Sequence, residues 1–105
     1  DVNGLQTDGA TADVMPSEPL EAKFAAFGWH VIKADGHDFD SLRAALAEAR
    51  ETKGKPSVIL MRTVKGRGVS FMENNAGWHG KAPNAEQYEQ AHAELSAAIE
   101  KLEVE

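Results

Sequence analysis

The stretch Val58-Ile59-Leu60-Met61 decides the fold of this chain. It is a continuous apolar run that includes two β-branched residues, and the Lys55-Pro56 dipeptide before it marks a connector. A short apolar run without alternation is typical of a strand that is covered on both faces of a parallel sheet. The run therefore predicts a buried parallel strand.

Two helices and a further strand are predicted before this run. Ser17 is the predicted N-cap of the first helix, with Pro19 near its first turn, and Gly28 ends it. The predicted elements are a helix with an apolar face of Leu20, Phe24 and Phe27, a strand over Trp29–Ala34 followed by a turn at Asp35-Gly36, and a helix capped by Asp38 or Asp40 with a buried stripe of Leu42, Ala45, Leu46 and Ala49.

A last helix is predicted near the C-terminus. Asn84, with Gln87 at the third helical position, forms a variant of the capping box. Its apolar stripe consists of Tyr88, Leu95, Ile99 and Leu102. With a strand end at Asp1-Val2-Asn3, the order is strand, helix, strand, helix, strand, long loop, helix. This alternation predicts an α/β fold, with a parallel sheet, right-handed crossovers and helices on both faces.

Residues 64–83 form a long segment without clear periodicity. Such segments are uncommon in compact domains and are usually functional or disordered. This one carries four glycines, two lysines, an arginine, two aromatic residues and a histidine. It follows the carboxyl end of the predicted buried strand, which is the edge where open parallel sheets bind their ligands. Position and composition both favour a binding loop.

Composition limits the class of protein. The chain has 105 residues, with 17 acidic and 11 basic residues and a formal net charge of −6. An acidic balance argues against nucleic acid or an anionic membrane as a partner, because both attract clustered cations. There is no cysteine, hence no disulfide or thiolate zinc site. No apolar run reaches the length of about 20 residues that a membrane helix needs. A soluble, cytoplasmic protein is expected.

Several polar residues are candidates for a site. The Lys65-Gly66-Arg67-Gly68 turn either cradles a phosphate or is a solvated basic turn. His79 is either a binding or proton-transfer residue or an ordinary loop histidine. His37 is interpreted as part of a tight turn and helix cap, and His30 and His92 as structural.

Asn3 and the backbone carbonyl of Leu5 are two neutral oxygen donors on one turn. Hard cations such as Mg²⁺ prefer oxygen ligands, but usually add carboxylate, water or phosphate oxygens to such a pair. The pair alone therefore predicts no tight metal site.

Several motifs occur here in one order and together cover nearly the whole chain. They closely resemble transketolase, specifically the N-terminal subunit of the split bacterial form. The segments are Asn3-Gly-Leu-Gln-Thr-Asp-Gly9, Phe27-Gly-Trp-His-Val31, Asp35-Gly-His-Asp38, Lys55-Pro-Ser-Val58, Thr63-Val-Lys-Gly-Arg-Gly-Val-Ser-Phe-Met-Glu-Asn74 and Trp78-His-Gly-Lys-Ala-Pro-Asn84.

The resemblance implies that thiamine diphosphate is held through Mg²⁺, which Ca²⁺ can replace. Asn3 matches the family's metal-ligand asparagine, and Leu5 matches the residue that offers its carbonyl. Thr7 lies where family members usually carry isoleucine against the cofactor ring, so this chain departs from the family there. His79 matches a catalytic histidine that reaches the diphosphate and the sugar substrate. The family fold is a parallel-sheet thiamine-diphosphate-binding domain.

The resemblance also implies that residues 1–105 are the C-terminal portion of that domain, about half of it. The segment that supplies the metal's carboxylate would precede Asp1, and Asp1 is not that ligand. The glutamate that activates the cofactor would come from a pyrimidine-binding subunit or domain. We therefore expect an oligomer that acts on sugar phosphates, and a chain that by itself binds cofactor weakly and is inactive.

Two alternatives remain open. One is a related thiamine-diphosphate enzyme with another acceptor, similar to deoxyxylulose-phosphate synthase. The other is a non-enzymatic module that serves in assembly. Assays with ketose phosphates and with pyruvate distinguish the enzymes from each other.

Overall fold

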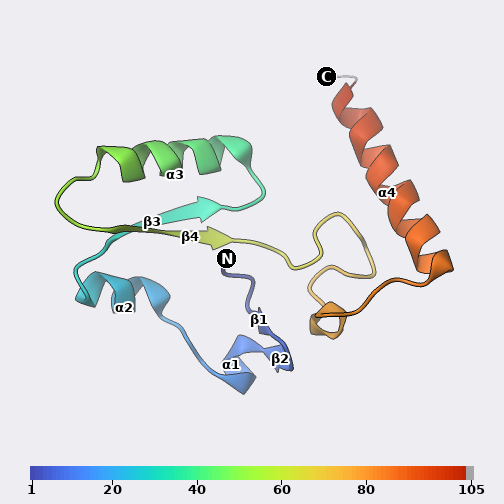
Figure 1. Cartoon of the computed structure of the whole chain (residues 1–105), viewed down its shortest axis with the longest axis horizontal. Coiled ribbons are helices and arrows are strands. Elements are labelled where there is room, and N and C mark those ends of the chain that lie inside the picture. Colours follow the sequence, from blue (N-terminus) through green and yellow to red (C-terminus); the bar gives the residue numbers. More distant parts are fainter. Residues whose placement is uncertain (104–105) are drawn as a thin grey trace.

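The computed structural model describes residues 1–103. Two short strands and two short helices come first, followed by a strand, a helix and a second strand that form the centre of the fold (Figure 1). They are β1 (Leu5–Gln6), β2 (Gly9–Ala10), α1 (Thr11–Val14), α2 (Leu20–Ala26), β3 (His30–Asp35), α3 (Phe39–Glu51), β4 (Ser57–Arg62), the short 3₁₀ helix η1 (Ala76–Trp78) and α4 (Ala85–Glu103).

The central sheet is parallel, as predicted. β3 and β4 pair in parallel from His30 opposite Ser57 to Asp35 opposite Arg62. Val2 pairs with the end of β4 on the side away from β3. Its amide donates to the Met61 carbonyl at 2.8 Å, and it forms an isolated parallel bridge with Arg62. The spatial order is therefore Val2, β4, β3. This confirms both the α/β class and the strand end predicted near the N-terminus.

The small core lies between α3 and one face of the sheet. Ile32 and Ala34 alternate along β3 with exposed Lys33, and both pack with Ala45 of α3. Leu42 joins this cluster from α3.

The helix α3 begins after the Asp38 cap, whose carboxylate accepts the Asp40 amide at 2.9 Å. Of the two predicted caps, Asp38 is therefore the one that forms.

Two predictions about buried positions near this core are wrong. Leu46 of α3 is 54 % exposed and does not pack with the core cluster, although it directly follows the buried Ala45. The run Val58–Met61 of β4 is only half-buried along its length. The reason is that α3 covers one face of the sheet, whereas the opposite side carries only the short helix α2 (Figure 1).

The start and end of α2 also differ from the prediction. The helix begins at Leu20, and the carboxylate of Glu18, not the hydroxyl of Ser17, accepts the Leu20 amide at 3.0 Å. Phe27 follows the last helical residue and is 85 % exposed, so it does not extend the apolar face. Phe24 does pack, with its ring 5.4 Å from that of Trp29.

The cap of α4 is confirmed, but its apolar stripe is not buried. The Asn84 amide donates to Gln87 Oε1 and the Gln87 amide donates to Asn84 Oδ1, both at 2.9 Å. The helix stands apart from the sheet (Figure 1). The stripe residues Tyr88, Leu95, Ile99 and Leu102 are therefore exposed.

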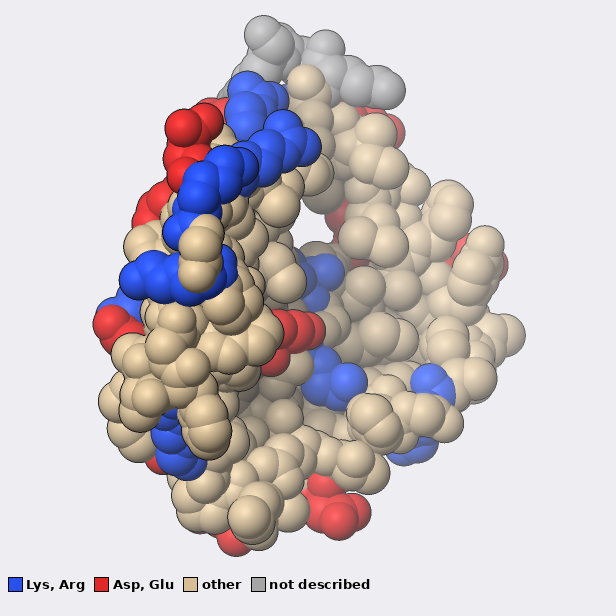
Figure 2. Space-filling view, turned by 60° about the vertical axis from the view of Figure 1, so that its left-hand side comes forward, with Lys and Arg blue, Asp and Glu red and all other residues tan. Residues whose placement is uncertain are grey.

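The molecule is flat and open. Its extents are 50 × 39 × 15 Å and its radius of gyration is 17.1 Å, against about 13 Å for a compact chain of this length. Acidic and basic side chains are interspersed on the face seen in Figure 2, and a deep hollow divides that face. Among the described residues, no helix has the length and apolar character needed to cross a membrane.

Candidate functional site

The N-terminal turn places Asn3 at the carboxyl edge of the parallel sheet. Val2 pairs with the end of β4, and the chain then turns through Gly4, whose φ is +76°. The Asn3 side-chain oxygen accepts the Leu5 amide at 2.9 Å. Asn3 is therefore oriented by its own turn, and its amide oxygen keeps one acceptor position for a ligand.

Leu5 and Thr7 follow on a small hairpin. β1 and β2 pair antiparallel, with Leu5 opposite Ala10 and Gln6 opposite Gly9. Thr7 begins the two-residue turn between these strands, and its side chain is exposed. Asn3, Leu5 and Thr7 are thus held on one compact unit.

The 64–83 loop is ordered by its own hydrogen bonds. The amides of Arg67 and Val69 donate to carbonyls within the turn at 3.2 and 3.1 Å, and the Gly68 amide donates to Glu73 Oε1 at 3.0 Å. The Asn74 amide closes the loop on the Lys65 carbonyl at 2.8 Å. Because these amides are occupied within the loop, they form no cradle for phosphate.

The end of the same loop positions His79. The Trp78 indole donates to the Phe71 carbonyl at 3.0 Å, and the two rings lie 5.2 Å apart. The His79 amide donates to the Ala76 carbonyl at 3.0 Å, immediately after η1. The imidazole is thereby carried on a folded turn at the surface and not on a free loop.

These segments meet in one cleft of about 510 Å³. The N-terminal turn and hairpin form one side, and the 64–83 loop forms the other. The residues that line it are Asp1, Asn3, Leu5, Gln6, Thr7, Lys65 and His79. All four residues that the sequence singled out for the cofactor are among them.

The donor set of this cleft fits a phosphate ligand. Lys65 supplies a cation, His79 an imidazole, and Asn3 an amide group. It fits a metal less completely: within residues 1–103, no group of three or more His, Cys, Asp or Glu side chains could hold one. The acidic residue of the lining, Asp1, already accepts the hydroxyl of Thr63. A hard cation there requires oxygens from elsewhere.

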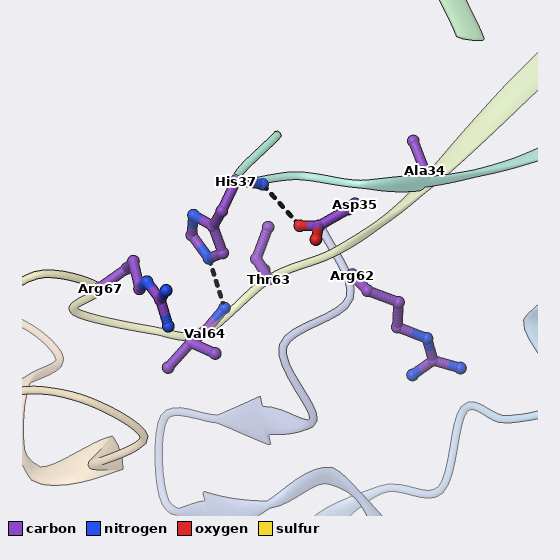
Figure 3. A pocket seen from close by; sticks show the side chains of 7 residues that line it. All are labelled: Ala34, Asp35, His37, Arg62, Thr63, Val64 and Arg67. Carbon is purple, nitrogen blue, oxygen red and sulfur yellow. Dashed lines mark hydrogen bonds between the residues drawn. The ribbon is translucent and has the colours of Figure 1, made fainter. Parts of the chain in front are cut away.

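A second cleft, of about 400 Å³, lies beyond the end of β4 (Figure 3). His37 takes part in its lining, and its amide donates to Asp35 Oδ1 at 2.9 Å, as expected of a tight turn. Its Nε2 also accepts the Val64 amide at 2.7 Å, which assigns the imidazole proton to Nδ1. His37 therefore ties the start of the 64–83 loop to the end of β3, a role that sequence spacing did not indicate.

The other two histidines lie on a strand and a helix, as predicted: His30 on β3 and His92 on α4. His30 Nε2 lies 2.7 Å from Glu48 Oε1 of α3. His92 lies beside Tyr88 on α4, with 5.9 Å between ring centroids. Neither lines the cleft of Asn3 and His79.

One carboxylate couples the loop to α4. Glu94 accepts the Ser70 hydroxyl and the Ser70 amide, each at 2.6 Å. These two hydrogen bonds, with a third from Gln90, hold the pKa of Glu94 below its ordinary value. The contact lies at the surface, so it marks a link between the two segments and not a buried ionic site.

Comparison with known proteins identifies the family of the chain. Residues 1–104 match the family described as "Transketolase, thiamine diphosphate binding domain". The chain is 45 % identical over 95 residues to the 6-deoxy-6-sulfo-D-fructose transketolase subunit of a Clostridium species, covering 90 % of this chain and 34 % of that protein. It is 42 % identical over 105 residues to an apulose-4-phosphate transketolase subunit of Phocaeicola vulgatus, covering 100 % and 37 %.

A solved structure shares the fold. The crystal structure of transketolase from Campylobacter jejuni superposes with a TM-score of 0.77 at 27 % identity, over 87 % of this chain and 14 % of that one. The chain therefore spans about a third of the length of the two subunits it matches, and a smaller share of this longer protein.

Proposed function

Because the chain belongs to the family of transketolase thiamine-diphosphate-binding domains, we propose that it is part of an enzyme that moves a two-carbon ketol unit between sugar phosphates. The observation that carries this proposal is the single cleft in which Asn3, Leu5, Thr7 and His79 meet. These residues come from two distant segments of the chain. A shared cleft is what a common ligand requires.

Each lining residue has a proposed role. Asn3, through its amide oxygen, and Leu5, through its backbone carbonyl, would hold Mg²⁺ beside the phosphates. Thr7 lies on the adjoining hairpin turn and would face the cofactor ring. Thiamine diphosphate, when bound, supplies stabilisation of the carbanion that the reaction needs. His79 would donate a hydrogen bond to the diphosphate and to the donor sugar, and so orient both.

We also propose that residues 1–105 form the C-terminal portion of the diphosphate-binding domain. The acidic metal ligand would come from the rest of the domain, and the activating glutamate from a pyrimidine-binding subunit. One fact supports this: the chain spans about a third of the length of its related subunits. The 105-residue chain alone would then bind cofactor weakly and catalyse nothing. Calorimetry that detects tight, Mg²⁺-dependent binding of thiamine diphosphate to the isolated chain would contradict the proposal that the other ligands come from outside residues 1–105.

The test of function uses the complete enzyme, which combines this chain with the remaining segments and the partner subunit. Ketol transfer from ketose phosphates is expected. Because related subunits are named for 6-deoxy-6-sulfo-D-fructose and for apulose 4-phosphate, both ketoses belong in the donor panel. Turnover of pyruvate in place of a ketose donor would favour the deoxyxylulose-phosphate-synthase-like alternative. No turnover with any donor, despite bound cofactor, would favour an assembly module.

Two histidine variants make the test specific to the cleft. His79→Ala is expected to lower kcat/KM about ten- to hundred-fold, because it removes a hydrogen bond to a charged group. His92→Ala is the matched control, since His92 lies on α4 outside the cleft and should leave kcat/KM unchanged. Equal effects of the two changes would refute the role of His79.

A further inference from the structure

We propose that Glu94 of α4 is a positioning residue, which fixes the place of His79 in the cofactor cleft by holding Ser70. This inference rests on the proposed function and deepens it, because it gives α4 a role in that same site. Glu94 itself does not line the cleft, so its effect passes through the 64–83 loop.

The helix α4 is attached to the rest of the chain at one residue of the loop. Glu94 Oε2 accepts the Ser70 amide and Glu94 Oε1 accepts the Ser70 hydroxyl, each at 2.6 Å. Gln90 donates to the same Oε1 at 2.9 Å and to the Ser70 hydroxyl oxygen at 3.3 Å. Among the described residues, and apart from the Asn84 cap, no other hydrogen bond joins α4 to the chain. Glu94 therefore decides where α4 and the loop meet.

The attachment is close and involves a charge. A Cβ at Gly68 would lie 3.2 Å from Leu95 Cδ2, so α4 reaches the loop backbone two residues before Ser70. The hydrogen bonds from Ser70 hold the pKa of Glu94 below its ordinary value, so its carboxylate is ionised at neutral pH. Hydrogen bonds to an ionised acceptor are stronger than those between neutral groups. The contact is therefore able to hold the loop in place.

Ser70 lies next to the contact that holds the turn before His79. Phe71, the following residue, accepts the Trp78 indole proton through its carbonyl at 3.0 Å, and the two rings lie 5.2 Å apart. Trp78 is the last residue of η1, and His79 follows it directly. A displacement of Ser70 therefore moves Phe71 and Trp78, and His79 moves with them.

The first test is a double-mutant cycle in the complete enzyme. Glu94→Gln keeps the size of the side chain and removes its charge, so kcat/KM for ketol transfer is expected to fall about five-fold, as loss of an exposed charge-assisted hydrogen bond does. In an enzyme that already carries His79→Ala, the same change should alter kcat/KM by less than about 1.5-fold, because its effect passes through His79. Glu89→Gln removes a charge from the same helix away from Ser70 and is the matched control, with unchanged kcat/KM.

A second readout follows the contact without using activity. In the complete enzyme, with ¹⁵N-tryptophan in this subunit only, NMR measures hydrogen exchange at the indole N–H groups. Glu94→Gln is expected to speed exchange at Trp78 about five-fold, because its hydrogen bond to Phe71 opens more often. Trp29 packs with Phe24 of α2 and should exchange at an unchanged rate. Ser70→Ala removes only the hydroxyl donor and should change both readouts less than Glu94→Gln does.

Other outcomes separate the possible failures. If Glu94→Gln lowers kcat/KM equally with and without His79, Glu94 supports the fold in general and the inference is wrong. Unchanged kcat/KM would mean that the loop holds His79 by its own hydrogen bonds, which also overturns it. A fall in kcat/KM without faster exchange at Trp78 would contradict the route through this residue.

Failure of the proposed function looks different. An unaltered enzyme without ketol transfer would defeat that function. Indole exchange then still tests the link from Glu94 to Trp78: a faster rate in Glu94→Gln supports the link, and an unchanged rate defeats the inference by itself.

Discussion

Gly66→Ala is the substitution for which the structure best defines the expected loss of free energy of unfolding. Gly66 has φ of +72°, and a Cβ built there would lie 2.6 Å from the Met72 carbonyl oxygen and 2.7 Å from its carbonyl carbon. The obstacle is backbone, which cannot rotate away as a side chain can. The left-handed conformation costs an alanine about 1–2 kcal/mol. Overpacking adds about 1–3 kcal/mol, so the total is about 2–5 kcal/mol.

Gly54→Ala separates these two contributions. Gly54 has nearly the same φ, +79°, but nothing lies within 4 Å of its Cβ position. It should lose only the conformational part, about 1–2 kcal/mol. Urea unfolding monitored by tryptophan fluorescence gives both free energies of unfolding. Equal losses for the two variants would refute the close packing of Gly66 against Met72. If the packing is as described, Gly66→Ala should also weaken cofactor binding, because the turn that carries Lys65 must shift.

Three further outcomes are expected. Asn84→Ala removes the reciprocal cap of α4 and should cost about 1 kcal/mol, measured as lost helicity by circular dichroism. The pKa of Glu94 is lowered, so its contact with Ser70 should be complete above the ordinary value of 4.5 and be lost as pH falls through the lowered pKa. The chemical shift of the Ser70 amide in a pH titration by NMR measures this loss. A transition above pH 4.5 would contradict the expectation. His37→Ala leaves the Val64 amide without its acceptor and should cost about 1 kcal/mol in urea unfolding, with faster hydrogen exchange at that amide.

Much of the fold could be predicted because its signals are local. The apolar run at 58–61 and the β3 pattern indicated parallel strands, and both strands lie within a residue or so of the predicted bounds. The Asn84 cap was predictable for the same reason, since its partner is three residues away. The order of the motifs also predicted the family and the two site residues Asn3 and His79, and these two residues share a cleft.

The predictions that failed concern which side chains are buried, because burial depends on residues that are distant in the sequence. Leu46 and Phe27 have the spacing of buried residues, but no element covers them. The stripe of α4, from Tyr88 to Leu102, is regular in sequence and still lies in solvent, because the helix stands away from the sheet. Periodicity states which residues share a face, and it carries no information about what packs there.

The sequence by itself determined the two central strands, the Asn84 cap of α4 and the residue types of the site, because hydrogen bonds and propensities act over a few residues. Only the tertiary structure decided that Lys65 and Arg67 of one turn face different clefts, and that His37 holds the loop through Val64. The path of the chain around the sheet edge sets these relations. Contacts between residues far apart in sequence have no local signature from which to predict them.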